Sequence, residues 1–176
     1  MKKSIWISRL SLVLLLAWGV NAPAQEVTES GTSTYYTMGK VIPLGGNTLF
    51  LSYEAIGLNI NDKGIGLFHN STLRALGSMT MEHGVYKDDR GAGVWNLQNG
   101  DKVFFTFTFT GETKPGGTGF AKGTVTFIDG TGHCAGIQGG AELIRYVVRS
   151  ATEEIGQNYH KAIIKYRLAF VNKPTE

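Results

Sequence analysis

The residues with the clearest chemical potential lie in one glycine-rich run, Gly130-Thr131-Gly132-His133-Cys134-Ala135-Gly136-Ile137-Gln138-Gly139-Gly140. Glycines at this density let a loop wrap a phosphate with its backbone N–H groups. A Walker loop, however, ends in Gly-Lys-Ser/Thr, and the third glycine of a dinucleotide fingerprint would come one residue before Gly136. Glycine also permits positive φ and a close approach of two backbones. We therefore predict a corner between two strands here, and no nucleotide or other cofactor.

The same run places His133 beside Cys134, which is the only cysteine and suggests a thiol nucleophile with a histidine base. Adjacent side chains on an extended chain point in opposite directions, so these two pair poorly. Another base would have to come from His69, His83 or His160. We expect a buried cysteine and a surface histidine instead. The four histidines also lack the spacing of zinc ligands, so we predict no metal.

Acidic residues flank a predicted hairpin at Asp88-Asp89 and Asp101. Paired carboxylates bind calcium or transfer protons in other proteins. Aspartate is also a common turn residue, because its side chain bonds to nearby backbone N–H groups. We interpret these aspartates as turn residues.

Alternating aromatic residues give the strongest candidate binding surface. In residues 103–110, Val103, Phe105, Phe107 and Phe109 share one face, opposite Phe104 and three threonines. This period of two predicts a strand. Small-molecule pockets are mostly apolar with a few polar groups. We therefore predict a substrate-binding lumen lined by Tyr86, Trp95, Phe105, Phe107, Tyr166 and Phe170, with Glu54, Arg74 and Arg145 as further polar groups. Alternatively, the aromatic residues fill the core or a subunit interface, because a sequence does not show which strand face is inside.

Further strands are predicted at 48–54, 92–97, 121–127 and 163–171, with weaker candidates at 35–41, 73–81 and 83–87. Residues 142–155 carry apolar side chains at helical spacing, whereas the β-branched residues near Val147 favour a strand. We favour the strand through Val148, followed by a turn or short helix near 152–157. About eight antiparallel strands close into a barrel that side chains fill or that holds one small ligand.

The first 24 residues have the features of a secretory signal peptide. Lys2 and Lys3 precede an apolar stretch, and Ala22-Pro23-Ala24 forms a small-residue cleavage pattern. The stretch is short for a membrane span, although an uncleaved anchor is the alternative. We expect export to the periplasm or the extracellular space. The remaining chain is predicted to have a flexible segment at 25–33 and one barrel domain at 34–172.

Removing this leader changes the charge of the protein. The chain has 17 Lys and Arg and 14 Asp and Glu, and the leader contributes Lys2, Lys3 and Arg9 but no acid. The rest therefore carries 14 of each and no net charge. Nucleic-acid binding depends on a basic surface, so we expect no nucleic-acid partner. We also expect no membrane partner after cleavage, because no basic run is present.

Three segments and their order resemble a known family. Gly100-Asp101-Lys102 leads into an aromatic strand, Gly117-Thr118-Gly119 precedes a second strand, and residues 130–140 have the spacing Gly-x-Gly-x-x-x-Gly-x-x-Gly. Residues 81–171 thus resemble exported bacterial proteins with an allene oxide cyclase-like barrel, which are related to plant dirigent proteins. The resemblance implies an eight-stranded antiparallel barrel of the calycin type with an apolar lumen, and barrels of this kind are often trimeric. We therefore count a homo-oligomer (dimer or trimer) among the partners to be tested. It places no catalytic residue on this chain.

Two functions follow from these observations. In the first, the barrel binds a small apolar ligand or guides its cyclisation, as a cyclase or isomerase would, and orientation supplies most of the rate gain. In the second, the protein is a non-catalytic structural or interaction protein with a side-chain-filled barrel. The lumen volume discriminates between them: less than about 100 Å³ argues against a ligand, because small-molecule pockets measure roughly 300–1,000 Å³.

Overall fold

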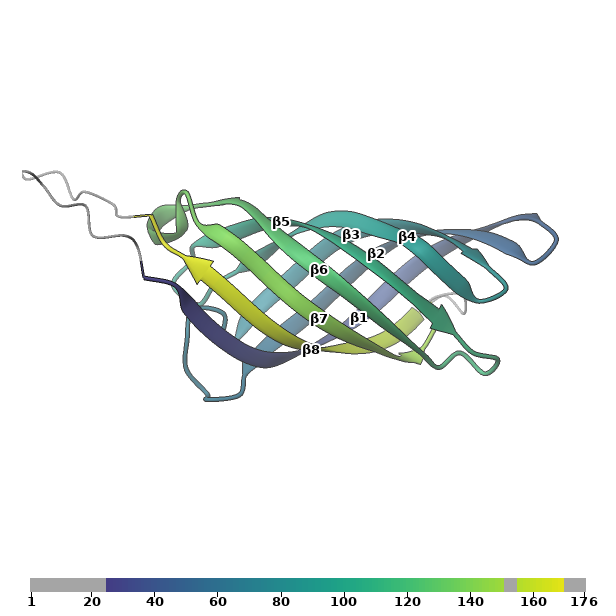
Figure 1. Ribbon diagram of the computed structural model, residues 1–176, viewed down its shortest axis with the longest axis horizontal. Coiled ribbons are helices and arrows are strands. Elements are labelled where there is room, and N and C mark those ends of the chain that lie inside the picture. The colour runs from purple at the N-terminus through teal and green to yellow at the C-terminus, as the bar shows by residue number, and fades with distance from the viewer. Residues whose placement is uncertain (1–24, 151–154, 170–176) are drawn as a thin grey trace, which may run out of the picture.

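The protein is a closed barrel of eight antiparallel strands, as the sequence predicts (Figure 1). The computed structural model describes residues 25–150 and 155–169. Each strand pairs with its neighbours in sequence, and β8 closes the barrel by pairing with β1. The elements are β1 (Val27–Gly45), β2 (Thr48–Asn61), β3 (Ser71–Glu82), β4 (Val85–Asn96), β5 (Lys102–Thr113), β6 (Gly119–Gly130), the 3-10 turn η1 (Gly132–Cys134), β7 (Gln138–Arg149) and β8 (Ile155–Arg167). Within the described ranges, no helix is long and apolar enough to cross a membrane.

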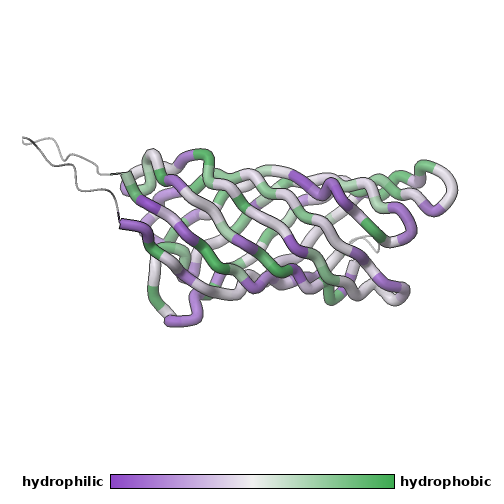
Figure 2. Tube along the Cα trace, in the orientation of Figure 1, coloured by the Kyte–Doolittle hydropathy of each residue, from purple (hydrophilic) through white to green (hydrophobic). Residues whose placement is uncertain are grey.

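The strands follow the alternation of apolar and polar residues. In β5, Val103, Phe105, Phe107 and Phe109 are buried, whereas Phe104 and the threonines between them are exposed. Figure 2 shows the same change of hydropathy along the tube of most strands. Side chains on successive strand residues point to opposite faces. The apolar members of each strand therefore meet inside the barrel, and the predicted inner face of β5 is confirmed.

The predicted flexible segment at 25–33 is wrong, because β1 begins at Val27. It pairs with β8 from Val27 opposite Tyr166 to Met38 opposite Ile155. Its inward residues at this end are Glu29, Gly31 and Ser33, which are buried. Their polar or small side chains hide the period of two that apolar residues show elsewhere. The barrel therefore starts before residue 34.

The ambiguous segment at 142–155 is a strand in its first part, as favoured. Strand β7 runs to Arg149, and β8 begins at Ile155, eight residues earlier than the predicted start at Ile163. The inward residues of early β8 include Gly156 and Asn158, which give no apolar alternation. Residues 151–154 lie outside the described residues, as do the predicted leader at 1–24 and Phe170.

Glycines on neighbouring strands make room for the large aromatic side chains in the lumen. A Cβ on Gly77 would lie 2.7 Å from Tyr53 Cζ and 2.8 Å from Phe107 Cζ. A Cβ on Gly91 would lie 2.6 Å from Phe107 Cζ. Such distances are closer than packed carbon atoms allow. These two glycines therefore make room for aromatic rings in the lumen.

The glycine-rich run forms the predicted corner. It ends β6 at Gly130, passes through η1 and enters β7 at Gln138. Positive φ angles at Gly132 and Gly136 turn the chain in a region that suits glycine. The Asp129 carboxylate accepts the backbone N–H groups of Gly130 at 2.7 Å and Gly136 at 2.9 Å, and these bonds lower its pKa.

Candidate functional site in the barrel lumen

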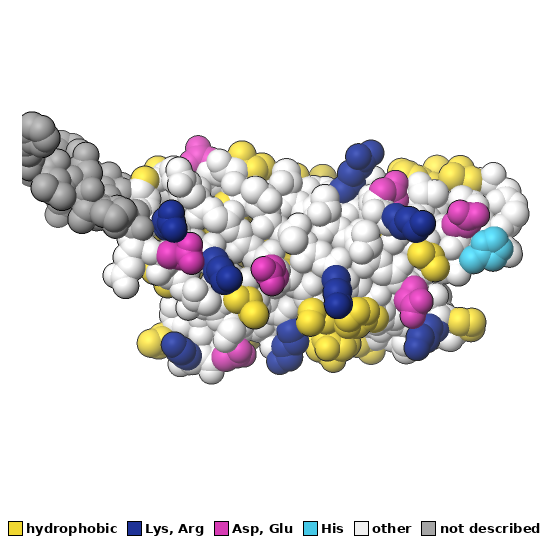
Figure 3. All heavy atoms as spheres, in the orientation of Figure 1, with side chains coloured by type: hydrophobic (Ala, Val, Ile, Leu, Met, Phe, Trp, Pro, Cys, Tyr) yellow, Lys and Arg dark blue, Asp and Glu magenta, His cyan; other side chains and the backbone are white. Residues whose placement is uncertain are grey.

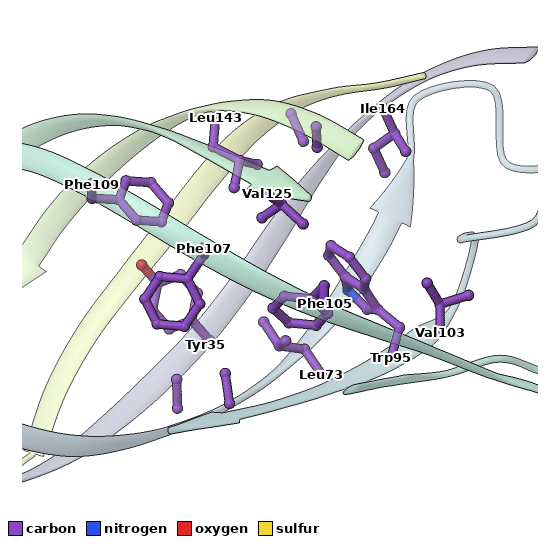
Figure 4. Packing of buried hydrophobic residues seen from close by; sticks show 14 of the residues in the cluster. Tyr35, Leu73, Trp95, Val103, Phe105, Phe107, Phe109, Val125, Leu143 and Ile164 are labelled. Atoms are coloured by element: carbon purple, nitrogen blue, oxygen red, sulfur yellow. The ribbon is translucent and has the colours of Figure 1, made fainter. Parts of the chain in front are cut away.

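Most of the predicted lumen residues do point into the barrel. Tyr86, Trp95, Phe105, Phe107, Tyr166 and Arg145 are all buried. Figure 4 shows Trp95, Phe105 and Phe107 converging on the interior from β4 and β5. The structure thus brings together six of the nine predicted site residues, and a seventh, Phe170, lies outside the described residues.

Glu54 and Arg74 do not belong to the lumen, which corrects the predicted set. They lie on the outer surface and form an ion pair, with Arg74 Nε 2.5 Å from Glu54 Oε1. Their neighbours on the same strands, such as Tyr53 on β2 and Leu73 on β3, occupy the inward positions. The period of two therefore turns Glu54 and Arg74 outward.

One end of the lumen is closed by the loop between β2 and β3. Phe68 from this loop is fully buried, and its ring lies 5.3 Å from that of Trp95, 5.6 Å from that of Phe127 and 5.6 Å from that of Tyr166. These edge and offset contacts suit aromatic packing. Phe68 therefore acts as a stopper, which the sequence did not reveal because the residue lies in a loop.

A buried carboxylate fixes this loop to the barrel. Glu29 of β1 accepts hydrogen bonds from the backbone N–H groups of Leu67 at 2.8 Å and Phe68 at 3.3 Å. It also accepts the Tyr166 hydroxyl at 2.8 Å and the Asn61 side-chain amide at 2.9 Å. Hydrogen bonds to an ionised acceptor are stronger than neutral ones, so Glu29 holds the closed end in place.

A polar cluster crosses the middle of the lumen. Asp89 of β4 and Arg145 of β7 form a buried ion pair through Asp89 Oδ2 and Arg145 Nη1. Tyr53 donates its hydroxyl to Asp89 Oδ1 at 2.5 Å. Arg145 donates its Nε–H to His160 Nε2 at 3.1 Å, and the Tyr35 hydroxyl lies 2.6 Å from the same nitrogen. The cluster thus links strands from both sides of the barrel.

The contact with Arg145 assigns the protonation state of His160. A guanidinium can only donate a hydrogen bond. His160 Nε2 must therefore be an acceptor, which places the proton of a neutral ring on Nδ1. Burial, and then the charge of Arg145, lower the pKa of His160 well below its usual value. The imidazole is accordingly neutral near pH 7.

The arginine of the cluster and the tyrosines around it also have shifted pKa values. Burial raises the pKa of Tyr35, Tyr53 and Tyr86, against the opposing effect of the Arg145 charge. Burial alone would lower the pKa of Arg145, but the surrounding tyrosines and Asp89 outweigh it and raise that pKa. General acids and bases work best with a pKa near the operating pH. The groups with shifted pKa values in this cluster are therefore poorly suited to proton transfer at pH 7.

The sequence analysis missed four members of this cluster: Tyr35, Tyr53, Asp89 and His160. Two of them carried a usable signal, because Tyr53 shares a strand face with Leu51, and His160 shares one with Ile164. Asp89 lies six residues before Trp95 and therefore shares its face on β4, but alternation from Tyr86 assigns it to the outside because a register shift separates Tyr86 from Asp89.

Two small cavities lie in the part of the lumen that the described residues form. One of about 40 Å³ lies among Trp95, Phe105, Phe107 and Phe109 and reaches Arg145. A second of about 30 Å³ lies on the other side of the cluster, beside Tyr86 and Asn158. A water needs roughly 10–15 Å³ of such space, so each cavity is of the size of a few water molecules at most.

One buried polar atom beside the larger cavity lacks a partner. The indole Nε1–H of Trp95 has no hydrogen-bond acceptor within the described part of the chain. The residue is 97 % buried, since its exposed fraction is 3 %. Leaving a buried donor unpaired costs about 1–3 kcal/mol. This N–H on the apolar cavity wall favours a ligand with an acceptor atom.

The predicted burial of Cys134 and surface position of His133 are confirmed. Cys134 is fully buried, and burial followed by the nearby Asp101 charge raises the pKa of its thiol to about 11. His133 is exposed and bonds Asp101 through its Nδ1 at 3.1 Å and its backbone N–H at 3.0 Å. A protonated thiol is a weak nucleophile. Residues 25–150 and 155–169 also contain no group of three or more potential metal ligands.

Comparison of the chain with protein-family models, with curated proteins and with solved structures finds no match. The functional argument therefore depends on the lumen and the surface of the barrel itself.

Proposed function

We propose that this protein is a non-catalytic interaction protein built on a side-chain-filled barrel. The observation that carries this proposal is the size of the interior cavities, about 40 and 30 Å³. Small-molecule sites measure roughly 300–1,000 Å³. A ligand would have to displace several buried aromatic side chains before it could enter.

The chemistry of the buried cluster supports the same proposal. Asp89, Arg145, His160 and two tyrosines use their polar atoms on one another. Replacing these bonds by contacts with a substrate would first leave a buried charge unpaired, which costs several kcal/mol. The cluster therefore has the character of a structural network across the lumen.

A second candidate function is the binding or cyclisation of a small apolar molecule that carries one hydrogen-bond acceptor. The unpaired Nε1–H of Trp95 beside the 40 Å³ cavity favours it. The resemblance to allene oxide cyclase-like and dirigent-related barrels favours it too, and a closed barrel of eight antiparallel strands is the coarse architecture that this resemblance implies. In this case Phe105 and Phe107 would move to admit the ligand.

A thermal-shift screen separates the two candidates. The probes are fatty acids, terpenoids and phenolics at up to 1 mM, because these classes are apolar and carry acceptor oxygens. A ligand at 100 times its dissociation constant adds about 2.7 kcal/mol of stability. The filled barrel predicts unchanged melting temperatures. A shift that disappears in Trp95→Phe, which keeps an aromatic ring but removes the N–H, would overturn the first proposal and support the second.

We also propose that residues 1–24 are an export signal. The basic start, apolar stretch and Ala22-Pro23-Ala24 pattern support this. Expression of the full chain in a bacterium, followed by N-terminal sequencing of the periplasmic fraction, is expected to give Gln25 as the first residue. Intact protein in the cytoplasm would contradict export.

A further inference from the structure

Two tyrosines face each other on the outer surface of the β7–β8 hairpin. Tyr146 of β7 lies directly opposite Tyr159 of β8 in the strand register. Their rings are nearly parallel, with an interplanar angle of 14° and centroids 4.8 Å apart. Paired aromatic rings commonly stack with an offset at such distances. The fold therefore holds the two phenol rings in contact.

The pair is accessible to a reagent in solution. The adjacent residues Arg145 and His160 point into the lumen, so the alternation of side chains turns both tyrosines outward. Tyr146 and Tyr159 are each half-buried, and Phe120 meets the Tyr146 ring edge-on at 5.7 Å. Figure 3 shows hydrophobic side chains, a class that includes tyrosine, gathered on the outer surface over β7 and β8. An oxidant can thus reach these rings without entering the barrel.

The other tyrosines lack such a partner. Four of them are buried in the lumen: Tyr35, Tyr53, Tyr86 and Tyr166. Tyr36 is 57 % exposed on the outer surface, but it lies opposite Ile56 on β2 and Gln157 on β8. Among the described strand pairs, Tyr146 and Tyr159 are therefore the only tyrosines in direct cross-strand register.

We propose that Tyr146 and Tyr159 are an oxidative cross-linking site, where a one-electron oxidant such as a haem peroxidase with hydrogen peroxide joins the two rings as dityrosine. Each phenol gives up one electron and one proton and becomes a phenoxyl radical with spin density on its ortho carbons. The two radicals form a bond between one ortho carbon of each ring, and the hydrogens on those carbons move to the oxygens and restore both phenols. Hydrogen peroxide takes up the two electrons and two protons and becomes two molecules of water.

The fold supplies the proximity that this coupling needs. Holding two reacting groups together turns a bimolecular step into an effectively unimolecular one. The β7–β8 ladder continues on both sides of the pair, with Arg145 opposite His160 and Val147 opposite Asn158, so the backbones beneath the rings stay in register. The torsion that turns a tyrosine ring has a broad minimum. The rings can therefore rotate out of their stack until two ortho carbons meet.

A bond at this position would clamp the two strands that carry the buried polar cluster. Arg145 and His160, whose side chains are in contact at 3.1 Å inside the barrel, directly adjoin the tyrosines in sequence. The chain has one cysteine, so it cannot form an internal disulfide. A covalent cross-link stabilises a fold mainly because it restricts the unfolded chain. This inference goes beyond the proposed function, because it does not depend on what the lumen holds.

Treatment of the purified protein with a haem peroxidase and hydrogen peroxide, at low protein concentration, tests this inference. Trypsin cuts after lysine and arginine, so the expected product is peptide 146–149 joined to peptide 150–161 with the loss of two hydrogen atoms. Tyr146→Phe and Tyr159→Phe keep the ring but lack the phenol, and each is expected to lose this product. The control Tyr36→Phe removes the exposed neighbouring phenol and is expected to retain it. Circular dichroism checks that each variant is folded.

Two further measurements complete the test. Oxidation in urea should largely lose the joined peptide, because the unfolded chain does not hold the rings together. Oxidation should also raise the melting temperature of the wild type and leave that of Tyr159→Phe unchanged. The site would be overturned by the absence of the joined peptide in the folded wild type, by an equal yield in urea, or by a product that Tyr36→Phe abolishes. A cross-linked protein that melts no higher than before would overturn the clamp.

Discussion

Truncation of Phe105 to alanine probes the filled lumen most sharply. Phe105 is 2 % exposed, its ring centroid lies 4.2 Å from that of Trp95, and it borders the 40 Å³ cavity. Removing a buried phenylalanine ring costs about 3–5 kcal/mol and leaves roughly 100 Å³ of space when the surroundings do not collapse. Joined to the existing cavity, this space would reach roughly 140 Å³, similar to an engineered apolar cavity of about 150 Å³ that binds benzene.

Urea denaturation followed by tryptophan fluorescence measures the loss of stability, and melting with and without benzene measures the new cavity. Phe105→Ala is expected to unfold about 3–5 kcal/mol more easily and to gain melting temperature with benzene, whereas the wild type gains none. The matched control is Phe104→Ala. It lies one residue earlier on β5, points outward and is 37 % exposed, so its cost should stay below about 1 kcal/mol.

Two results would refute this reasoning. A cost below about 1 kcal/mol for Phe105→Ala would mean that its ring does not fill a packed interior. An equal benzene shift in the wild type would mean that the lumen already admits a ligand.

Three other predictions concern the cluster and the glycines. Asp89→Asn leaves the buried Arg145 charge without its carboxylate and should lower the free energy of unfolding by about 3–5 kcal/mol; a urea midpoint within error of the wild type would contradict the buried pair. Because the pKa of His160 is depressed in the fold, the unfolded chain binds the proton first. Stability should therefore fall as the pH drops below about 6.5, and His160→Gln should reduce this slope between pH 7 and 5, whereas an unchanged slope would show that another group is responsible. Gly77→Ala should cost about 1–3 kcal/mol by overpacking against Phe107, and combining it with Phe107→Ala should cost less than the sum of the two; simple additivity in the double-mutant cycle would exclude that contact.

The sequence was sufficient for the fold class and for the aromatic wall of the lumen. Phe105 and Phe107 alternate with threonines, so a single pattern fixes both the strand and its inner face. Closure into a barrel followed from the number of strands and the short turns. Of the predicted polar groups, Arg145 lies inside because it continues the alternation of Ala141 and Leu143 on β7, and Tyr86 lies inside although a register shift follows it on β4.

The parts that the sequence did not reveal share a physical cause. Glu29, Ser33 and His160 point inward although they are polar, and the cited partners on neighbouring strands lie 26 to 125 residues away in the sequence. A hydrophobic pattern cannot mark such positions, because pairing inside the fold is what makes their burial tolerable. The Phe68 stopper was hidden for a related reason, since a loop has no periodicity to show which residue enters the core.

Glu54 and Arg74 illustrate the opposite error. We assigned both residues to the lumen because a small-molecule pocket usually has a few polar groups among its apolar side chains. In the structure they form an ion pair with each other on the outer surface. The polar groups of the lumen come instead from Asp89 and His160, where a register shift and a run of small residues obscure the strand face.

Native mass spectrometry of the protein, purified without denaturation from the cells that express it, tests the central claim most directly. A barrel filled by its own side chains predicts that each copy has the mass of the polypeptide alone. An additional non-covalent mass of about 100–500 Da per copy, released on unfolding, would contradict the account, because a cavity of about 40 Å³ has no room for such a molecule.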